Sequence, residues 1–234
     1  KRKNYRNDKN NKDFFDKPLF TLPSYLFWFL QGGAYFFITN ILLVLFITAT
    51  AINPDSFNLI ILFISLIPLG PSLSALSAST SEILREKSIS FSSYFFKSYK
   101  DNFVSSLKLW LIILFLLSLM FVDFQYFFLN MPKYGIHVVF EILAIYIALL
   151  ILYAIPINSR FEMKTKDIFI LSSYYIIKKL PITILKSAIL VGSFYLVSKT
   201  TSLLIIVLPS IISFIFSFYD NTIFTDIECS QKTA

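Results

Sequence analysis

Cysteine and histidine are almost absent from this sequence: its 234 residues include one of each, Cys229 and His137. A single cysteine excludes an intrachain disulfide, and one cysteine with one histidine leaves too few ligands for a thiolate or imidazole metal site. The same scarcity excludes a Ser-His-Asp or Cys-His catalytic set, and the acidic residues form no evident catalytic pair. We therefore expect no metal, no cofactor and no enzymatic activity.

Glycine and charge are also scarce. Five glycines provide no glycine-rich phosphate loop, and charged residues make up only 15% of the chain. A soluble domain of this length needs more charge to cover its surface. Hydrophobic residues instead reach 56%, and mean hydropathy is +0.69. The composition predicts an integral membrane protein.

Six apolar stretches each approach the roughly 20 residues that an α-helix needs to cross a bilayer. The predicted fold is therefore an all-α, polytopic membrane helix bundle. A short polar link separates the last two stretches, so a five-span arrangement is the alternative. The predicted spans are Tyr25–Ala51, Leu59–Ser81, Leu107–Leu129, Ile136–Ile157, Ile182–Val197 and Leu203–Tyr219.

Positive charge is distributed unevenly between the ends of these spans. With the N-terminus inside, 19 of the 21 Lys and Arg residues fall in predicted cytoplasmic segments, and only Lys133 and Lys199 fall outside. This asymmetry favours cytoplasmic N- and C-termini. It also argues against nucleic-acid binding, because the charge forms no single patch. The predicted layout is a basic cytoplasmic segment (1–24), a membrane bundle (25–219) and a cytoplasmic tail (220–234).

The two internal cytoplasmic segments resemble each other and predict two interfacial helices, a weak internal repeat that any basic membrane elbow could also produce. Each carries aromatic or apolar residues at helical spacing together with lysines. These faces either dock a partner protein or lie at the lipid boundary. The docking candidates are Phe91, Tyr94, Phe95, Tyr99, Arg160, Ile168, Leu171 and Tyr175. Arg160 is also expected to pair with Glu162 or to reach the membrane surface.

Polar residues within spans are costly, so they are candidate functional positions. Asn40 either bonds a neighbouring helix or lines a substrate route. Asp123 and Glu141 form an outward-facing proton or cation site, or else Glu141 stabilises a helix N-terminus while Asp123 lies near headgroup water. A proline- and glycine-containing motif marks a bend, either a gate or a fixed packing feature; its residues are Pro68, Gly70, Pro71, Ser74 and Ala75.

At this motif the chain resembles the YesL family of small bacterial membrane proteins, which has no assigned activity. The resemblance is carried by Asn40, the 68–76 stretch PLGPSLSAL, Arg85-Glu86-Lys87, the 94–103 stretch YFFKSYKDNF, Val122-Asp123 and the 153–156 stretch YAIP. It extends from about Tyr25 to Tyr219. The first span and the Asn53-Pro54-Asp55 turn depart from the family pattern.

The resemblance implies a role near carbohydrate ABC importers in the cytoplasmic membrane of Gram-positive bacteria. The leading hypothesis is a non-enzymatic accessory subunit of oligosaccharide uptake that binds the importer's permease, its ATPase or both. The permease docking loop with its Glu-Ala-Ala and Gly signature is absent from the sequence. The alternatives are an independent small-solute transporter or channel, and a membrane signalling or assembly protein.

Overall fold

The described part of the chain is entirely helical, apart from its connections. The structure is a computed structural model that describes residues 18–85, 90–131, 134–199 and 204–233. The predicted basic segment therefore lies outside the described residues up to position 17. The elements, in chain order, are α2 (Pro18–Thr39), α3 (Ile41–Ile52), the short 3-10 turn η1 (Pro54–Ser56), α4 (Leu59–Leu66), α5 (Leu69–Arg85), α6 (Phe91–Asp101), α7 (Phe103–Asn130), α8 (His137–Arg160), α9 (Thr165–Lys178), α10 (Leu180–Lys199) and α11 (Leu204–Thr233).

Among the described residues, five helical segments are long and apolar enough to cross a membrane, and a bent pair provides up to one more. The five are Leu59–Arg85, Phe103–Asn130, His137–Arg160, Leu180–Lys199 and Ile205–Cys229; the pair is Ser24–Thr39 with Ile41–Ile52. The predicted all-α, polytopic membrane fold is confirmed, and the chain is a multi-pass membrane protein.

The first predicted span is not one straight helix, since α2 and α3 meet at an angle of 76°. The break is at Asn40, whose backbone N–H and side-chain amide both donate to the carbonyl of Phe36, at 3.1 and 2.7 Å. An amide side chain that bonds the preceding turn competes with helix continuation. Asn40 therefore shapes its own helix pair, whereas the sequence predicted a bond to a neighbouring helix or a substrate route.

The helix is interrupted at the Pro68 motif, between α4 and α5, and Trp110 of α7 packs against this interruption. The indole Nε1–H donates to the carbonyl of Leu66, the last residue of α4, at 2.8 Å. Gly70 is buried, and a Cβ at this position would overlap the Trp110 side chain. Pro71, Ser74 and Ala75 are also buried. Gly70 is thus a close-contact position, because a side chain there would displace α7.

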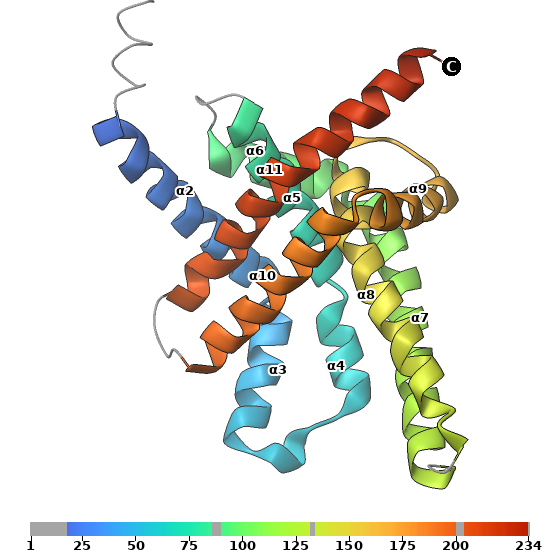
Figure 1. Cartoon of the computed structure of the whole chain (residues 1–234). Coiled ribbons are helices and arrows are strands. Elements are labelled where there is room, and N and C mark those ends of the chain that lie inside the picture. The colour runs from blue at the N-terminus through green and yellow to red at the C-terminus, as the bar shows by residue number, and fades with distance from the viewer. Residues whose placement is uncertain (1–17, 86–89, 132–133, 200–203, 234) are drawn as a thin grey trace, which may run out of the picture.

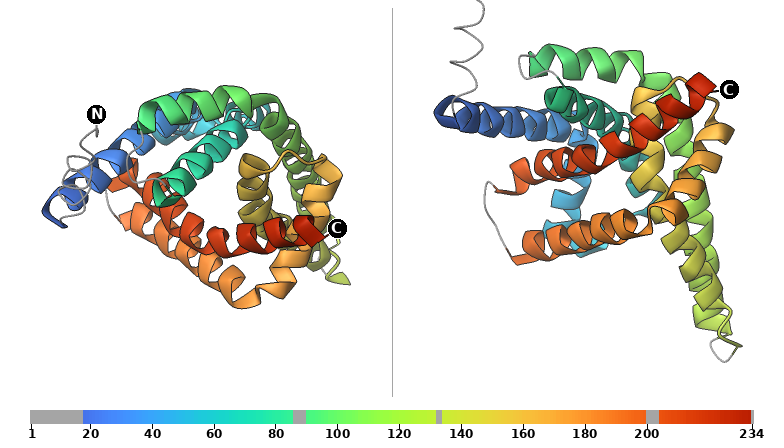
Figure 2. Two further views of the ribbon diagram at one scale, coloured as in Figure 1. Left: turned by 90° about the horizontal axis from the view of Figure 1, so that it is seen from above. Right: turned by 45° about the horizontal axis from the view of Figure 1, so that its top comes forward.

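The described helices form two buried clusters, and α5 belongs to one of them and packs against the other. One joins α7, α8, α9 and the C-terminal half of α11; the other joins α5 to α6. Figure 1 shows α6 and the C-terminal end of α11 at one end of the molecule. The η1 turn between α3 and α4 and the adjoining ends of α7 and α8 lie at the opposite end (Figure 1). Figure 2 shows α2 beside α11, where Gly33 leaves room for the carbonyl of Ile206.

The C-terminal residues belong to the helix bundle. The sequence predicted that the bundle ends at Tyr219, with a tail from 220 to 234. Instead α11 continues to Thr233, and Ile223, Phe224 and Ile227 are buried in the larger cluster. These three apolar residues lie at positions i, i+1 and i+4, which places them on one face of the helix.

Candidate functional site

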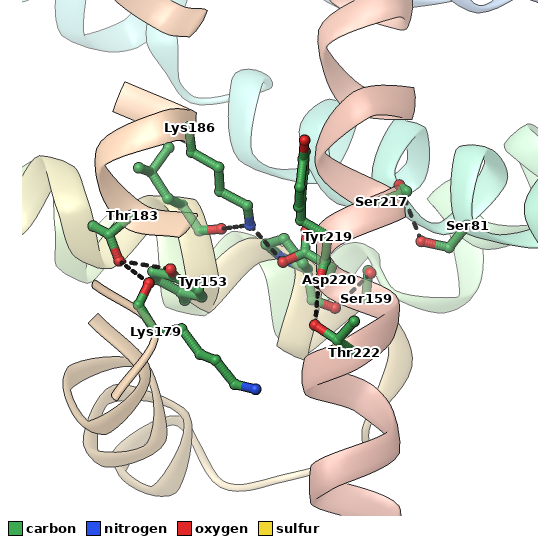
Figure 3. Close-up of polar contacts among 12 residues, drawn as sticks. Ser81, Tyr153, Ser159, Lys179, Thr183, Lys186, Ser217, Tyr219, Asp220 and Thr222 are labelled. Atoms are coloured by element: carbon green, nitrogen blue, oxygen red, sulfur yellow. Dashed lines mark hydrogen bonds and ion pairs between the residues drawn. The ribbon is translucent and has the colours of Figure 1, made fainter. Parts of the chain in front are cut away.

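An ion pair lies buried between α10 and α11. Lys186 Nζ is 2.5 Å from Asp220 Oδ1, and the two residues are 0% and 2% exposed. The same ammonium donates to the carbonyl of Leu152 on α8 at 3.3 Å, so three helices meet at this point (Figure 3). Charges inside membrane spans are rare, and they face the bundle interior or a cavity and pair with one another. This pair is therefore the principal candidate site.

Aromatic rings surround the lysine. Its Nζ lies 4.6 Å from the ring centroid of Tyr153 and 5.2 Å from that of Phe216. Tyr153 forms a buried 2.7 Å hydrogen bond with Thr183, one turn before Lys186 on α10. Cation–π contacts of a desolvated ammonium add to the ion pair. Asp220 Oδ2 is buried without a hydrogen-bond partner among the described residues.

Hydroxyl side chains of α5 and α11 form hydrogen bonds with each other next to the ion pair. Thr80 is 2.9 Å from Ser213 and 2.8 Å from Ser217, and Ser81 donates to Ser217 at 3.1 Å. Small hydroxyl-bearing residues let helices approach closely and bond across the contact. These contacts fix the height and rotation of α11, and with them the position of Asp220.

Two further acidic residues of α11 pair with the basic segment between α8 and α10. Asp226 lies 3.3 Å from Lys179 and 3.8 Å from Lys178, and Glu228 lies 2.6 Å from Arg160. The expected pairing of Arg160 with Glu162 is wrong, because α11 extends far enough to place Glu228 against it. The last turns of α11 are thus held by charges on α8 and α9.

The intramembrane polar residues predicted from sequence do not form one site. Asn40 lies at the α2–α3 break, whereas Asp123 and Glu141 lie on α7 and α8. Within the described residues, no ion pair or hydrogen bond joins any two of the three. His137 lies against the rings of Phe124 and Phe128, at 6.2 and 5.5 Å between ring centroids, and this aromatic contact accounts for its position.

The predicted docking faces of the two basic segments point into the chain itself. Both segments are helical, as α6 and α9. Phe91 and Phe95 are buried against α5, and Ile168 and Tyr175 are buried in the larger cluster. Tyr94, Tyr99, Leu171 and Arg160 are half-buried. The helical spacing identified the apolar faces correctly, but the bundle itself occupies them, which leaves Phe96 as the exposed aromatic of α6.

One apolar cavity adjoins the ion pair, and an apolar groove lies farther along α10 and α11. The cavity, of about 270 Å³, is lined by residues of α2, α5, α8, α10 and α11, including Leu152 and Phe216 beside Lys186. The groove, of about 600 Å³, lies between α10 and α11 and is lined by Ile189, Gly192, Leu196, Leu208 and Ile215 among others. The ion pair therefore lies close to space that an apolar group can occupy.

The family model described as "Protein of unknown function, DUF624" matches residues 36–124. This segment runs from the end of α2 into α7 and includes Gly70 and Trp110. No curated protein and no solved structure matches the chain. Lys186 and Asp220 lie beyond the matched segment, so their pairing is known from the structure alone.

Sequence reasoning missed both partners of the ion pair. Lys186 was counted among the cytoplasmic charges at a span end, and Asp220 was assigned to the tail. A signal was present in the sequence: Lys186 lies near the start of the predicted span Ile182–Val197, and Asp220 directly follows the end of the next one, Leu203–Tyr219. Because consecutive spans run in opposite directions, Lys186 near the start of α10 and Asp220 late in α11 reach the same depth.

Proposed function

We propose that this chain is a non-enzymatic accessory subunit that binds the permease of a carbohydrate ABC importer within the bacterial cytoplasmic membrane. The family match over residues 36–124 supports the YesL-like resemblance, from which the importer class is taken. The resemblance suggests the partner, and the packing of α10 suggests the binding surface.

The observation that carries the proposal is the incomplete packing of α10. Only 11% of its most apolar stretch is buried inside the chain, the smallest share among the five spanning segments. Its large side chains face outward, with Phe194 78% exposed, and the groove of about 600 Å³ separates it from α11. Gly192 and Ser193 are small residues in the lining of this groove, which favours close helix contact in membranes. A permease helix in this groove would complete the packing.

Copurification in mild detergent tests the proposal. The tagged chain, expressed with its importer, is expected to retain the permease pair. Gly192→Phe fills the groove without an internal clash, because no atom lies within 4 Å of a Cβ at this position. Ile145→Phe enlarges an exposed residue on α8 as the matched control. We expect the Gly192→Phe variant to lose the permease and the Ile145→Phe variant to retain it. If the wild-type protein copurifies with neither permease nor ATPase at matched expression, the proposal is refuted.

One observation favours a second candidate, an independent small-solute transporter. The cavity of about 270 Å³ contacts the residues that flank Lys186, and Ser77 and Ser213 add hydroxyls to its lining. A solute could enter there if the Lys186–Asp220 pair opened. Flux of sugar or protons through the purified chain alone in liposomes would select this function over the first.

A further inference from the structure

A third cavity, of about 320 Å³, differs from the other two in its polar lining. It lies where α5 and α8 end, beside α6 and the last turns of α11. Its polar lining residues are Ser81, Arg85, Tyr94, Ser159, Arg160 and Glu228. Its volume is at the lower end of the range for small-molecule sites.

Arg160 is held in place by Glu228 and Phe224, yet part of its guanidinium group has no hydrogen-bond acceptor in the part of the chain that the structure describes. One guanidinium nitrogen, Nη2, donates to Glu228 Oε1 at 2.6 Å, and the guanidinium carbon lies 4.8 Å from the Phe224 ring centroid. The second terminal nitrogen, Nη1, is buried and has no hydrogen-bond partner among the described residues. A buried guanidinium donor left unpaired costs free energy, so this nitrogen is expected to meet an acceptor in the cavity.

Arg85 and Tyr94 add a second cation and a phenol to the lining of the cavity. Arg85 pairs with Glu82, and the Tyr94 hydroxyl donates to the same Glu82 carboxylate at 3.2 Å. Burial, followed by the negative charge of Glu82, raises the pKa of Tyr94, which keeps the phenol protonated. Two arginines from different helices thus face one polar cavity, and each is balanced by one glutamate.

We propose that this cavity binds a phosphate group. Guanidinium groups match phosphate oxygens in geometry and charge, and two arginines provide more donors than a carboxylate accepts. The remaining volume accommodates a small substituent such as glycerol. Both a lipid headgroup and a free phosphate ester present this chemistry. Glu228 is 43% exposed and can turn toward solvent, so an incoming phosphate can replace it on Arg160.

Whether the ligand is a free phosphate ester is tested with purified full-length protein in neutral detergent. Inorganic phosphate and glycerol 3-phosphate are the probes, and chloride at equal ionic strength is the reference. Nanodiscs with and without phosphatidic acid test the lipid source. Titration calorimetry and the shift in unfolding temperature are the readouts. Response to the soluble probes assigns a free phosphate ester, whereas response to phosphatidic acid alone assigns a headgroup; a response to neither overturns the proposal.

Four variants distinguish this cavity from general attraction to basic residues. Arg160→Lys and Arg85→Gln each remove charge-assisted hydrogen bonds and should weaken binding about tenfold. Glu228→Gln removes the competing carboxylate and should tighten it. Lys97→Gln with Lys100→Gln changes exposed charges on α6, outside the cavity, and should leave binding unchanged. Because Arg85 and Glu228 are both 43% exposed, their variants should fold; wild-type affinity in both would overturn the proposal.

Discussion

Gly70 shows how one missing side chain sets the distance between two helices. Its ideal Cβ would overlap Trp110, whose indole also bonds the end of α4. We expect Gly70→Leu to reduce stability by about 1–3 kcal/mol, because overpacking forces helices and side chains apart. Thermal unfolding in detergent measures this loss. Gly192→Leu, at a helical glycine with open space, is the control; equal stability of the two variants would mean that Trp110 moves aside freely.

Because Lys186 and Asp220 form a buried ion pair, we expect the stability losses of their single substitutions to be non-additive. Either Lys186→Met or Asp220→Asn leaves one buried charge uncompensated, which costs about 3–5 kcal/mol. The double variant should be more stable than at least one single variant, since it buries no charge. Lys179→Met, which breaks a partly exposed pair with Asp226, should cost about 0–1 kcal/mol. Unfolding midpoints of the four variants test this, and purely additive losses would contradict the coupling.

At the scale of elements, α6 tests whether its aromatic face serves packing or docking. Phe95 is 0% exposed, whereas its neighbour Phe96 is 48% exposed. Phe95→Ala should therefore destabilise the protein by about 3–5 kcal/mol, as truncation of a buried phenylalanine does. Phe96→Ala should cost clearly less, although its ring contacts Tyr35. If Phe95→Ala keeps wild-type stability but loses a copurifying partner, the face docks instead.

Hydropathy and spacing predicted most elements but not their neighbours. The long apolar stretches became α7, α8 and α10 because continuous hydrophobicity alone specifies a spanning helix. The break at Asn40 was missed, since the asparagine side chain ends α2 within an uninterrupted apolar run. Helical spacing located the buried face of α6 but cannot say whether α5 or another protein covers it. The site at Lys186 needed tertiary structure, because its partner is 34 residues away.

For the whole molecule, complementary charge connects the C-terminal helix to the bundle. The three acids Asp220, Asp226 and Glu228 each face a base from an earlier part of the bundle: Lys186, Lys179 and Arg160. The same turns of α11 bury Ile223 and Phe224. Apolar packing thus provides the contact area, and the charges select the register of α11, because a slip along the helix axis would separate all three pairs. This arrangement also brings the C-terminal end of the chain to the same end as α6 (Figure 1).

The end of the molecule that contains α6 can be placed relative to the membrane from its charge. Segments with basic residues, including α6 and α9, lie at the opposite end from η1 and the adjoining ends of α7 and α8 (Figure 1). Because cytoplasmic segments retain Lys and Arg, we expect the α6 end to face the cytoplasm. Native Cys229 and Ser93→Cys, the latter made in a Cys229→Ser background, are exposed sites at that end, and Ser56→Cys is exposed at the other. An impermeant maleimide should label Ser56→Cys in intact cells and the other two only after lysis. Labelling of Cys229 or Ser93→Cys in intact cells would invert the topology, and with it the side on which the arginine-lined cavity opens.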